Sequence, residues 1–324
     1  MKTKMTSLLK KNEAVSACLV IGGILLLSLT SPYFLQRVNL DSLQTAIAPY
    51  GIMSIGMMVL LISGVFDLSV GSVMCLGGLV TGICLNAGAN VPLAILAGIL
   101  AGTLVGLVNG LLVEVAGINA LIATIGMQYI ARGICEIALV DKGKGGYRDF
   151  PELFLSLGRG QFLGVYYMVW IMAGLMIAFQ LYLRYAPSGR QLYHLGGNYA
   201  AARQMGIKNK LVRIRAFMLS GTLAALAGVL VTARSGVANR YTGENAHMDI
   251  IIACIIGGGS LAGGRGSIVG ALFGMTFMKL MSNAFNLYTI APQWQSIIVG
   301  GILLLVLAVD GYVYLSKQKK LGKI

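Results

Sequence analysis

Charged side chains are scarce in this sequence of 324 residues. Only 11% of the residues are Asp, Glu, Lys or Arg, whereas a soluble domain usually carries about 25%. So little charge cannot cover a water-exposed surface, and 57% of the residues are hydrophobic. The composition therefore argues against a soluble globular protein and indicates that lipid surrounds much of the chain.

The motifs of ATP-binding subunits and of metallohydrolases are missing. The sequence has no G-x-x-x-x-G-K-[ST] loop to hold ATP phosphates and no H-E-x-x-H zinc motif. It has only two histidines, and its five cysteines lie inside apolar runs without metal-ligand spacing. We therefore expect no catalytic residue, no metal and no cofactor in this chain.

Long apolar runs are abundant. They lack the ~10-residue alternating segments of a membrane β-barrel, and most approach the roughly 20 residues that a membrane helix needs. About ten spans are expected, at roughly 14–30, 43–63, 70–87, 92–112, 119–140, 164–183, 213–233, 248–262, 267–286 and 294–311. Glycine-rich breaks interrupt the segments 43–87 and 248–286. The predicted fold class is an all-α polytopic membrane protein with interrupted helices.

The basic residues indicate the orientation of the chain. With ten spans and a cytoplasmic N-terminus, the inside segments hold sixteen Lys and Arg residues, against seven in the outside loops. This distribution predicts a cytoplasmic N-tail (1–13), a single transmembrane domain (14–311) and a cytoplasmic C-tail (312–324). The net charge of +14 is thereby attributed to membrane topology, and no nucleic-acid partner is expected.

Ionisable residues within or beside the spans are candidates for function. They are Asp67, Glu114, Arg132, Glu136, Asp249, Lys279 and Asp310. Glu114, Asp249 and Asp310 lie near span ends and are expected to reach the membrane interface. Arg132 and Glu136 are four residues apart and are expected to pair on one helix face. Such groups are few, which counts against an ion-coupled transporter.

The longest inside loop contains a capped helix. Residues 187–195 predict a turn, Gly196-Gly197-Asn198 a break, and 199–205 a short helix. Asn198 suits the N-cap of this helix, and Gly206 suits its C-terminal end. A basic, capped helix at the membrane surface is either a docking element for a partner or a loop that binds anionic lipid.

This segment, 187–208, resembles the cytoplasmic coupling region of permeases in the ribose and galactose branch of ABC importers. The family pattern is Gly-Arg-x-Leu/Ile-Tyr-x-x-Gly-Gly-Asn-x-x-Ala-x-Arg-x-x-Gly-Ile. The matching residues are Gly189, Arg190, Tyr193, Gly196, Gly197, Asn198, Ala201, Arg203, Gly206 and Ile207. The resemblance implies that this helix rests in a groove of a separate ATP-binding subunit.

Three further segments are similar to the same family. Residues 67–72, Asp-Leu-Ser-Val-Gly-Ser, match its Asp-Leu-Ser string, although Val65 and Phe66 replace Gly and Ile; Asp67 and Ser69 are expected to cap the next helix. Asn109-Gly110 and 122–126 resemble its Asn-Gly and Ile-Ala-Thr-Leu-Gly strings, although 119–121 depart from the usual Pro-Pro-Phe. A structural glycine turn is formed by Gly257, Gly258, Gly259, Gly263, Gly264 and Gly266.

The resemblance implies a type II-like importer bundle in the bacterial cytoplasmic (inner) membrane. The implied partners are an ABC ATP-binding subunit that holds ATP and Mg, an extracytoplasmic solute-binding protein, and a second permease copy or paralogue. The predicted solute is a simple sugar or a sugar-like small polar molecule. A nucleoside, a furanone-type signal sugar, a branched-chain amino acid, an ion-coupled carrier and a non-transporting scaffold remain alternatives. The proposed pathway residues are Asp67, Ser69, Asn109, Asn119, Thr124 and Gln128.

Overall fold

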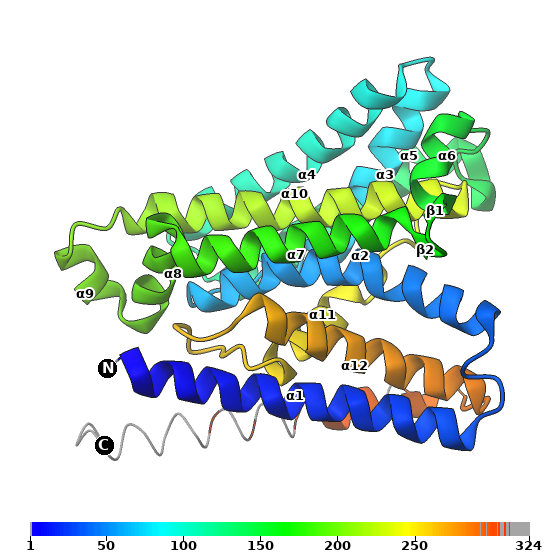
Figure 1. Cartoon of the computed structure of the whole chain (residues 1–324). Coiled ribbons are helices and arrows are strands. Elements are labelled where there is room, and N and C mark those ends of the chain that lie inside the picture. The colour runs from blue at the N-terminus through cyan, green and yellow to red at the C-terminus, as the bar shows by residue number, and fades with distance from the viewer. Residues whose placement is uncertain are drawn as a thin grey trace.

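The protein is a bundle of long helices, seen here in a computed structural model (Figure 1). The structure describes residues 2–291, 293–295, 297–302, 304, 308 and 311. Its helices are α1 (Lys2–Thr30), α2 (Arg37–Ile62), α3 (Val70–Asn86), α4 (Val91–Glu114), α5 (Ala120–Ala138), η1 (Val140–Gly145), α6 (Glu152–Arg159), α7 (Tyr167–Tyr185), α8 (Pro187–Gly197), α9 (Tyr199–Gln204), α10 (Asn209–Ser235), α11 (Ala246–Ile256) and α12 (Ile268–Leu287). Two short strands, β1 (Gln161–Phe162) and β2 (Val165–Tyr166), form a small antiparallel hairpin.

Within the described residues, seven helices are long and apolar enough to cross a membrane. They are α1 from Glu13 onward, α2, α4, α5, α7, α10 and α12. The apolar helices α3 and α11 are shorter and occupy the predicted spans 70–87 and 248–262, the latter ending early at the glycine turn. The predicted span 294–311 is described only in part, and the C-tail 312–324 lies entirely outside the described residues.

Helices α2 and α10 form the centre of the bundle. Helix α10 packs on α2, α3 and α4, and α12 packs on α1, α2 and α11. The inner face of α2 is closed to solvent at Ile52, Met57 and Leu60. Glycines allow the closest approaches: a Cβ on Gly221 of α10 would clash with the carbonyl oxygen of Gly102 on α4, a packing typical of membrane helices.

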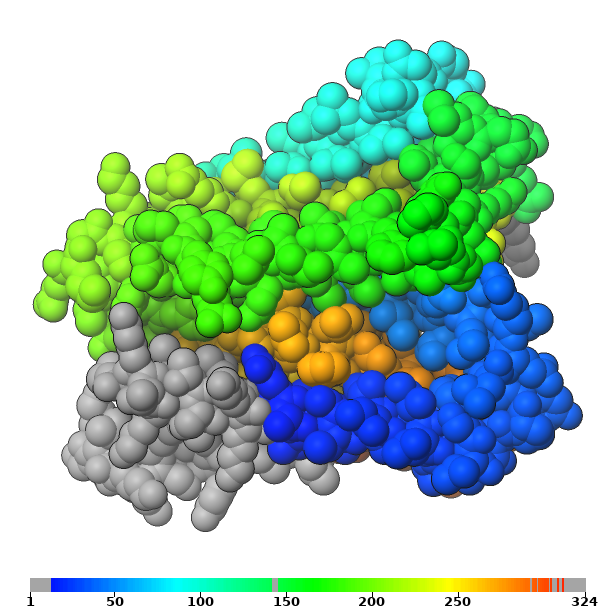
Figure 2. All heavy atoms as spheres, viewed as in Figure 1, coloured from blue at the N-terminus to red at the C-terminus, as the bar shows by residue number. Residues whose placement is uncertain are grey.

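The outer helices leave much apolar surface exposed, as expected for helices that contact lipid. Leu100 and Leu104 of α4 and Ile177 of α7 are exposed. In the space-filling view, α12 comes to the surface between α7 and α1 (Figure 2). The flanks of this chain therefore present apolar surface, whereas its centre is packed.

The two ends of the bundle differ in structure. One end carries α8 and α9 together with the N-terminus, and the other carries α6, β1 and β2 (Figure 1). The predicted outside loop, 141–163, contributes most of η1, the whole of α6 and β1. The α8–α9 end also holds the break 63–69 and the glycine turn, since Gly263 and Gly264 contact Gly196 of α8. This end is where the candidate site lies.

Candidate coupling site

Two consecutive helices form the segment 187–208. The expected turn at 187–195 is wrong, because Pro187–Gly197 is the helix α8; proline is well suited to a first helical position. Extended backbone at Asn198 (φ −161°) separates α8 from α9, and the Asn198 side chain accepts a hydrogen bond from the Ala201 N–H at 3.0 Å. Gly206, at φ +79°, follows the end of α9. The expected N-cap and C-terminal glycine are therefore confirmed.

Backbone contacts fix α8 to two other segments. Gly196 lies against the carbonyl of Ile62 at the end of α2 and against the N–H of Gly264, leaving no space for a Cβ. The Gly264 N–H donates to the Ile62 carbonyl at 2.9 Å. The Tyr193 hydroxyl donates to the carbonyl of Gly266 at 2.9 Å. Helix α8, the end of α2 and the glycine turn thus meet as one rigid contact.

The Tyr193 hydroxyl stays protonated over the physiological range. Burial, and secondarily the negative charge of Glu13, raise the pKa of Tyr193 to about 12. The hydroxyl therefore remains a donor to Gly266 whenever the segment is docked in this way.

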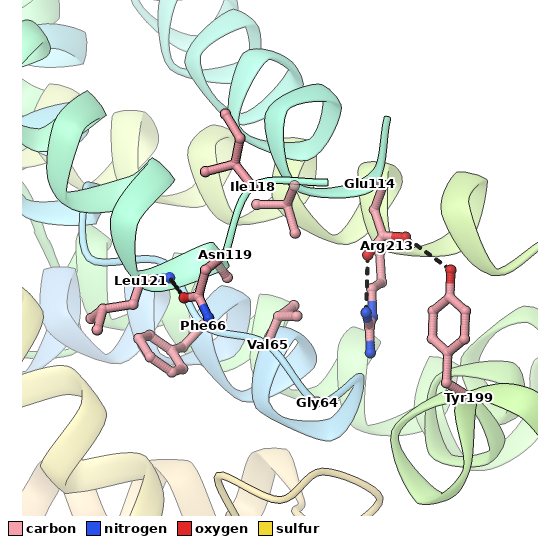
Figure 3. A pocket seen from close by; sticks show the side chains of 11 residues that line it. Gly64, Val65, Phe66, Glu114, Ile118, Asn119, Leu121, Tyr199 and Arg213 are labelled. Atoms are coloured by element: carbon pink, nitrogen blue, oxygen red, sulfur yellow. Dashed lines mark hydrogen bonds and ion pairs between the residues drawn. The ribbon is translucent and has the colours of Figure 1, made fainter. Parts of the chain in front are cut away.

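An ion pair links α9 to three spans (Figure 3). Arg213 of α10 lies 3.0 Å from Glu114 at the end of α4, and its Nη2 donates to the carbonyl of Ser63 at 2.9 Å. Tyr199 of α9 donates to the other carboxylate oxygen of Glu114 at 3.2 Å. The Arg213 guanidinium also lies 4.8 Å from the centre of the Tyr199 ring, a favourable cation–π distance. Helix α9 is therefore connected to α4 and α10 directly, and through Arg213 to the end of α2.

A cavity of about 390 Å³ lies beside this ion pair. Its walls come from the break after α2, the α4–α5 connection, α9 and α10, and they include Phe66, Asn119 and Tyr199. Such a volume is within the range of small-molecule pockets (about 300–1,000 Å³). Its mixed lining of aromatic, amide and ionic groups places a polar space next to the coupling segment.

The predicted coupling residues divide into buried and exposed groups. Gly189 packs against the Tyr182 carbonyl of α7, and the Ile207 N–H donates to the Ala202 carbonyl. Arg190, Gly197, Arg203 and Gly206 are exposed, and Ala201 is half-buried. Met205, beside Arg203, is 64% exposed. Helix α9 and the residue that follows it therefore present a cation and an apolar side chain on the surface of this end.

The predicted pathway residues do not share one surface. Asp67, Ser69 and Asn109 come together in a single hydrogen-bonded cluster, and all three are fully buried. Thr124 is also buried, with its hydroxyl bonded to the Ala120 carbonyl. Asn119 caps α5 and lines the cavity, and Gln128 is partly exposed on α5.

The expected cap of α3 is wrong. Ser69 occupies the N-cap position, but its side chain makes no capping hydrogen bond. Its hydroxyl and its backbone N–H both donate to Asp67 instead. The two residues therefore bond to each other within the break, and the first turn of α3 has no side-chain cap.

The glycine turn 257–267 has the geometry that its composition predicts. Gly258, Gly263, Gly264 and Gly266 have φ values between +72° and +144°, which side chains with a Cβ rarely adopt. Gly257 packs against the backbone of Gly270 on α12, and Gly259 against the Cys254 carbonyl. These six residues shape a sharp turn rather than a ligand-binding surface.

Three residues of the ion-pair cluster were missed by sequence reasoning. Glu114 was expected to reach the interface, but it is buried and paired with Arg213. Tyr199 was treated only as part of a short helix. The available signal is topological, because the predicted topology puts Glu114 and Arg213 at span ends on one side of the membrane, where opposite charges can pair.

A further expectation about membrane charges is wrong. Arg132 does not pair with Glu136; it donates to the backbone carbonyls of Arg240 and Thr242. Asp249, in the first turn of α11, pairs with Lys279 at 3.0 Å. Asp310 lies outside the described residues.

Comparison with known proteins decides the family. The model of a family described as the permease component of branched-chain amino acid transport systems matches residues 39–307. The chain belongs to this permease family. The match covers the described spans from α2 to α12, so this permease is a multi-pass protein of the inner membrane.

Individual relatives of this permease are of similar length. It is 34% identical to the ribose import permease protein of Escherichia coli K12 over 303 residues, which cover 93% of this chain and 94% of the relative. It is 36% identical to the L-arabinose transport system permease protein of the same strain, covering 89% and 87%. It is 34% identical to the autoinducer 2 import system permease protein of Salmonella choleraesuis, covering 84% and 78%.

Proposed function

We propose that this permease is the membrane-spanning subunit of an ATP-driven importer for a simple sugar or a sugar-like solute. The relatives named for ribose, arabinose and autoinducer 2 support this solute class, and the autoinducer relative keeps a signal sugar as a second candidate. The observation that carries the coupling role is the anchoring of α8 and α9. They contact four other segments through Gly196, Tyr193 and Tyr199 while exposing Arg190 and Arg203.

In this proposal, α8 and α9 move together as a rigid unit and pass the movement of the ATP-binding subunit to the spans. A separate ATP-binding subunit, which holds ATP and Mg, docks on the exposed face of α9. Closure of that subunit moves Tyr199, and the ion pair of Glu114 with Arg213 transmits the movement to Ser63 and the break after α2. Inverting a two-state equilibrium from 1:99 to 99:1 takes about 5.5 kcal/mol of differential binding, which ATP supplies.

The end of the bundle that carries α8 and α9 faces the cytoplasm in this proposal. The basic residues of 184–215 support that orientation. Both termini are then cytoplasmic, and α6 with the β1–β2 hairpin faces the extracytoplasmic solute-binding protein. A cysteine accessibility assay with a membrane-impermeant reagent tests the orientation: Arg203→Cys should react only in inverted vesicles, and reaction in right-side-out cells contradicts it.

The solute pathway is better placed on the outer face of α5 than at the buried Asp67 cluster. Ile122, Tyr129 and Glu136 are exposed at helical spacing, and a Cβ on Gly126 or Gly133 would meet no atom within 4 Å. A carboxylate facing hydrocarbon is unfavourable. A second permease copy or paralogue therefore covers this face and encloses a polar path between the two subunits.

Crosslinking between copies tests this placement. In a chain with the exposed Cys18 replaced by Ser, Gly133→Cys should form a disulfide between two permeases, whereas Leu104→Cys on the lipid-exposed face of α4 should not. Equal crosslinking at both positions contradicts the placement.

The solute class is tested by uptake. The measurement is the accumulation of labelled D-ribose, L-arabinose and leucine in intact cells that carry the complete importer. Accumulation of a sugar that persists when an ionophore collapses the ion gradients supports the proposal. Accumulation of leucine alone, or loss of sugar uptake with the ion gradients while cellular ATP is maintained, contradicts it.

A further inference from the structure

Asp67 lies in an unusual position for a carboxylic acid. It belongs to the break between α2 and α3 and is completely closed to solvent, as are its neighbour Ser69 and Asn109 of α4. The ion pairs among the described residues do not include it. Its only polar surroundings are therefore hydrogen-bonding groups.

The hydrogen bonds to this carboxyl group are strongly asymmetric. Oδ1 of Asp67 accepts from the Ser69 N–H at 2.8 Å, from the Ser69 hydroxyl at 2.6 Å and from the Asn109 amide at 3.3 Å. Within the described part of the chain, Oδ2 of Asp67 has no partner. The side-chain oxygen of Asn109 is also buried and without a partner there.

An ionised carboxylate does not fit this pattern. Its two oxygens share the negative charge and both need donors, and a buried charged oxygen without one is strongly unfavourable. A carboxylic acid has different needs at its two oxygens, because the carbonyl oxygen accepts and the hydroxyl donates. The buried Oδ2, unpartnered among the described residues, fits a protonated acid, in which Oδ1 is the accepting carbonyl oxygen and Oδ2 carries the proton.

The side chains of Asp67 and Asn109 each have one buried oxygen without a partner among the described residues, and a single proton can serve one oxygen of each. The amide nitrogen of Asn109 donates to Oδ1 of Asp67. The side-chain amide of Asn109 therefore contacts the carboxyl group of Asp67, and its oxygen is part of that same amide. We propose that Asp67 carries a proton in this conformation and that its Oδ2–H donates to the side-chain oxygen of Asn109. The result is a neutral acid–amide pair that joins the break to α4.

The charged groups of the helices around the break are paired with each other or lie far from Asp67 along the chain, which is consistent with a neutral acid. Helix α3 contains no charged residue, and the charged residues of α2, Arg37 and Asp41, lie at its opposite end. The nearest charges from α4 and α10 are Glu114 and Arg213, which pair with each other at the Ser63 end of the break. Among the described residues, no cation forms an ion pair with Asp67.

The pair has a role beyond the proposed import function. It joins the break between α2 and α3 to Asn109 of α4. This inference concerns the bonding of the break and holds whatever solute is carried, so its spectroscopic test is independent of the transport proposal.

Infrared spectroscopy of the purified permease in lipid tests the protonation directly. At neutral pH we expect an absorption band of a protonated carboxyl group that disappears in Asp67→Asn. The band should persist in the control Glu152→Gln, which removes an exposed acid at the start of α6. Absence of a band that depends on Asp67 overturns the proposal.

Transport provides a second, separate readout. Asp67→Asn keeps a neutral donor where the acid had one, so uptake by the complete importer should stay within about twofold of the parent. The exchanged variant, Asp67→Asn with Asn109→Asp, restores an acid–amide pair and should also be active. If Asp67 binds a cation as a carboxylate, Asp67→Asn abolishes uptake at normal membrane levels, and the proposal fails.

Discussion

At the scale of single residues, the pair of Arg213 and Glu114 is the most sensitive contact of the coupling site. Removing one partner of a buried ion pair leaves an uncompensated charge and costs about 3–5 kcal/mol. Arg213→Ala should therefore lower the midpoint of thermal unfolding in detergent by far more than Arg215→Ala, which removes an exposed arginine two residues along the same helix. Equal shifts in the two variants would show that the pair adds nothing to stability.

The Tyr193 hydroxyl gives a prediction about pH. Its raised pKa of about 12 means that its stabilising bond to Gly266 is fully present below the ordinary tyrosine pKa, about 10, and is lost only as the pH rises through about 12. The stability difference between the parent and Tyr193→Phe should therefore be the same at pH 7 and pH 9. A difference that shrinks between these two pH values contradicts the assignment.

The sequence identifies some of these residues and not others. The N-cap at Asn198 and the helix end at Gly206 can be predicted from the sequence. Each depends only on the conformation and hydrogen bonds of residues within a few positions along the chain. Tyr199, Glu114 and Arg213 come from three separate helices, and no local pattern brings them together. The burial of Asp67 is likewise a property of the packed bundle, so a reading of the motif alone placed it in the pathway.

At the scale of elements, Gly196 and Gly197 form a matched pair at the end of α8. A Cβ on Gly196 would collide with the Ile62 carbonyl and the Gly264 N–H, whereas a Cβ on Gly197 would meet nothing within 4 Å. Gly196→Ala should separate α8 from α2 and reduce uptake by the complete importer at least about tenfold, the effect of roughly 1.4 kcal/mol. Gly197→Ala should remain near the parent. Similar uptake by the two variants would show that the contact is not needed for coupling.

The elements themselves are mostly predictable, and their interruptions are less so. Apolar length alone locates α4, α5, α7, α10 and α12 to within four residues at each end, and places the start of α2 six residues late. The sequence predicts a turn at 187–195 and a break at 196–198, yet contacts of Gly189 with α7 and of Gly196 with α2 stabilise α8. Tertiary packing overrides local propensity at these positions.

At the scale of the whole molecule, the chain has a packed centre and unpartnered flanks. Helices α2 and α10 are largely buried, whereas α4, α5 and α7 expose apolar side chains. Composition predicts this membrane-spanning bundle, and the distribution of Lys and Arg predicts its orientation. The partners cannot be placed from composition, because their contacts depend on which surfaces remain free after folding: α9 at one end and the outer face of α5 along the side.

The central claim is that α9 docks on a separate ATP-binding subunit. The most direct measurement is the ATPase activity that co-purifies with the tagged permease from its native membrane in mild detergent. The account predicts co-purification with the parent and with Arg184→Glu, an exposed charge reversal outside 187–208, and its loss with Arg203→Glu on α9. Retention of the ATPase by Arg203→Glu at the parent's level, or no ATPase with any form, contradicts the claim.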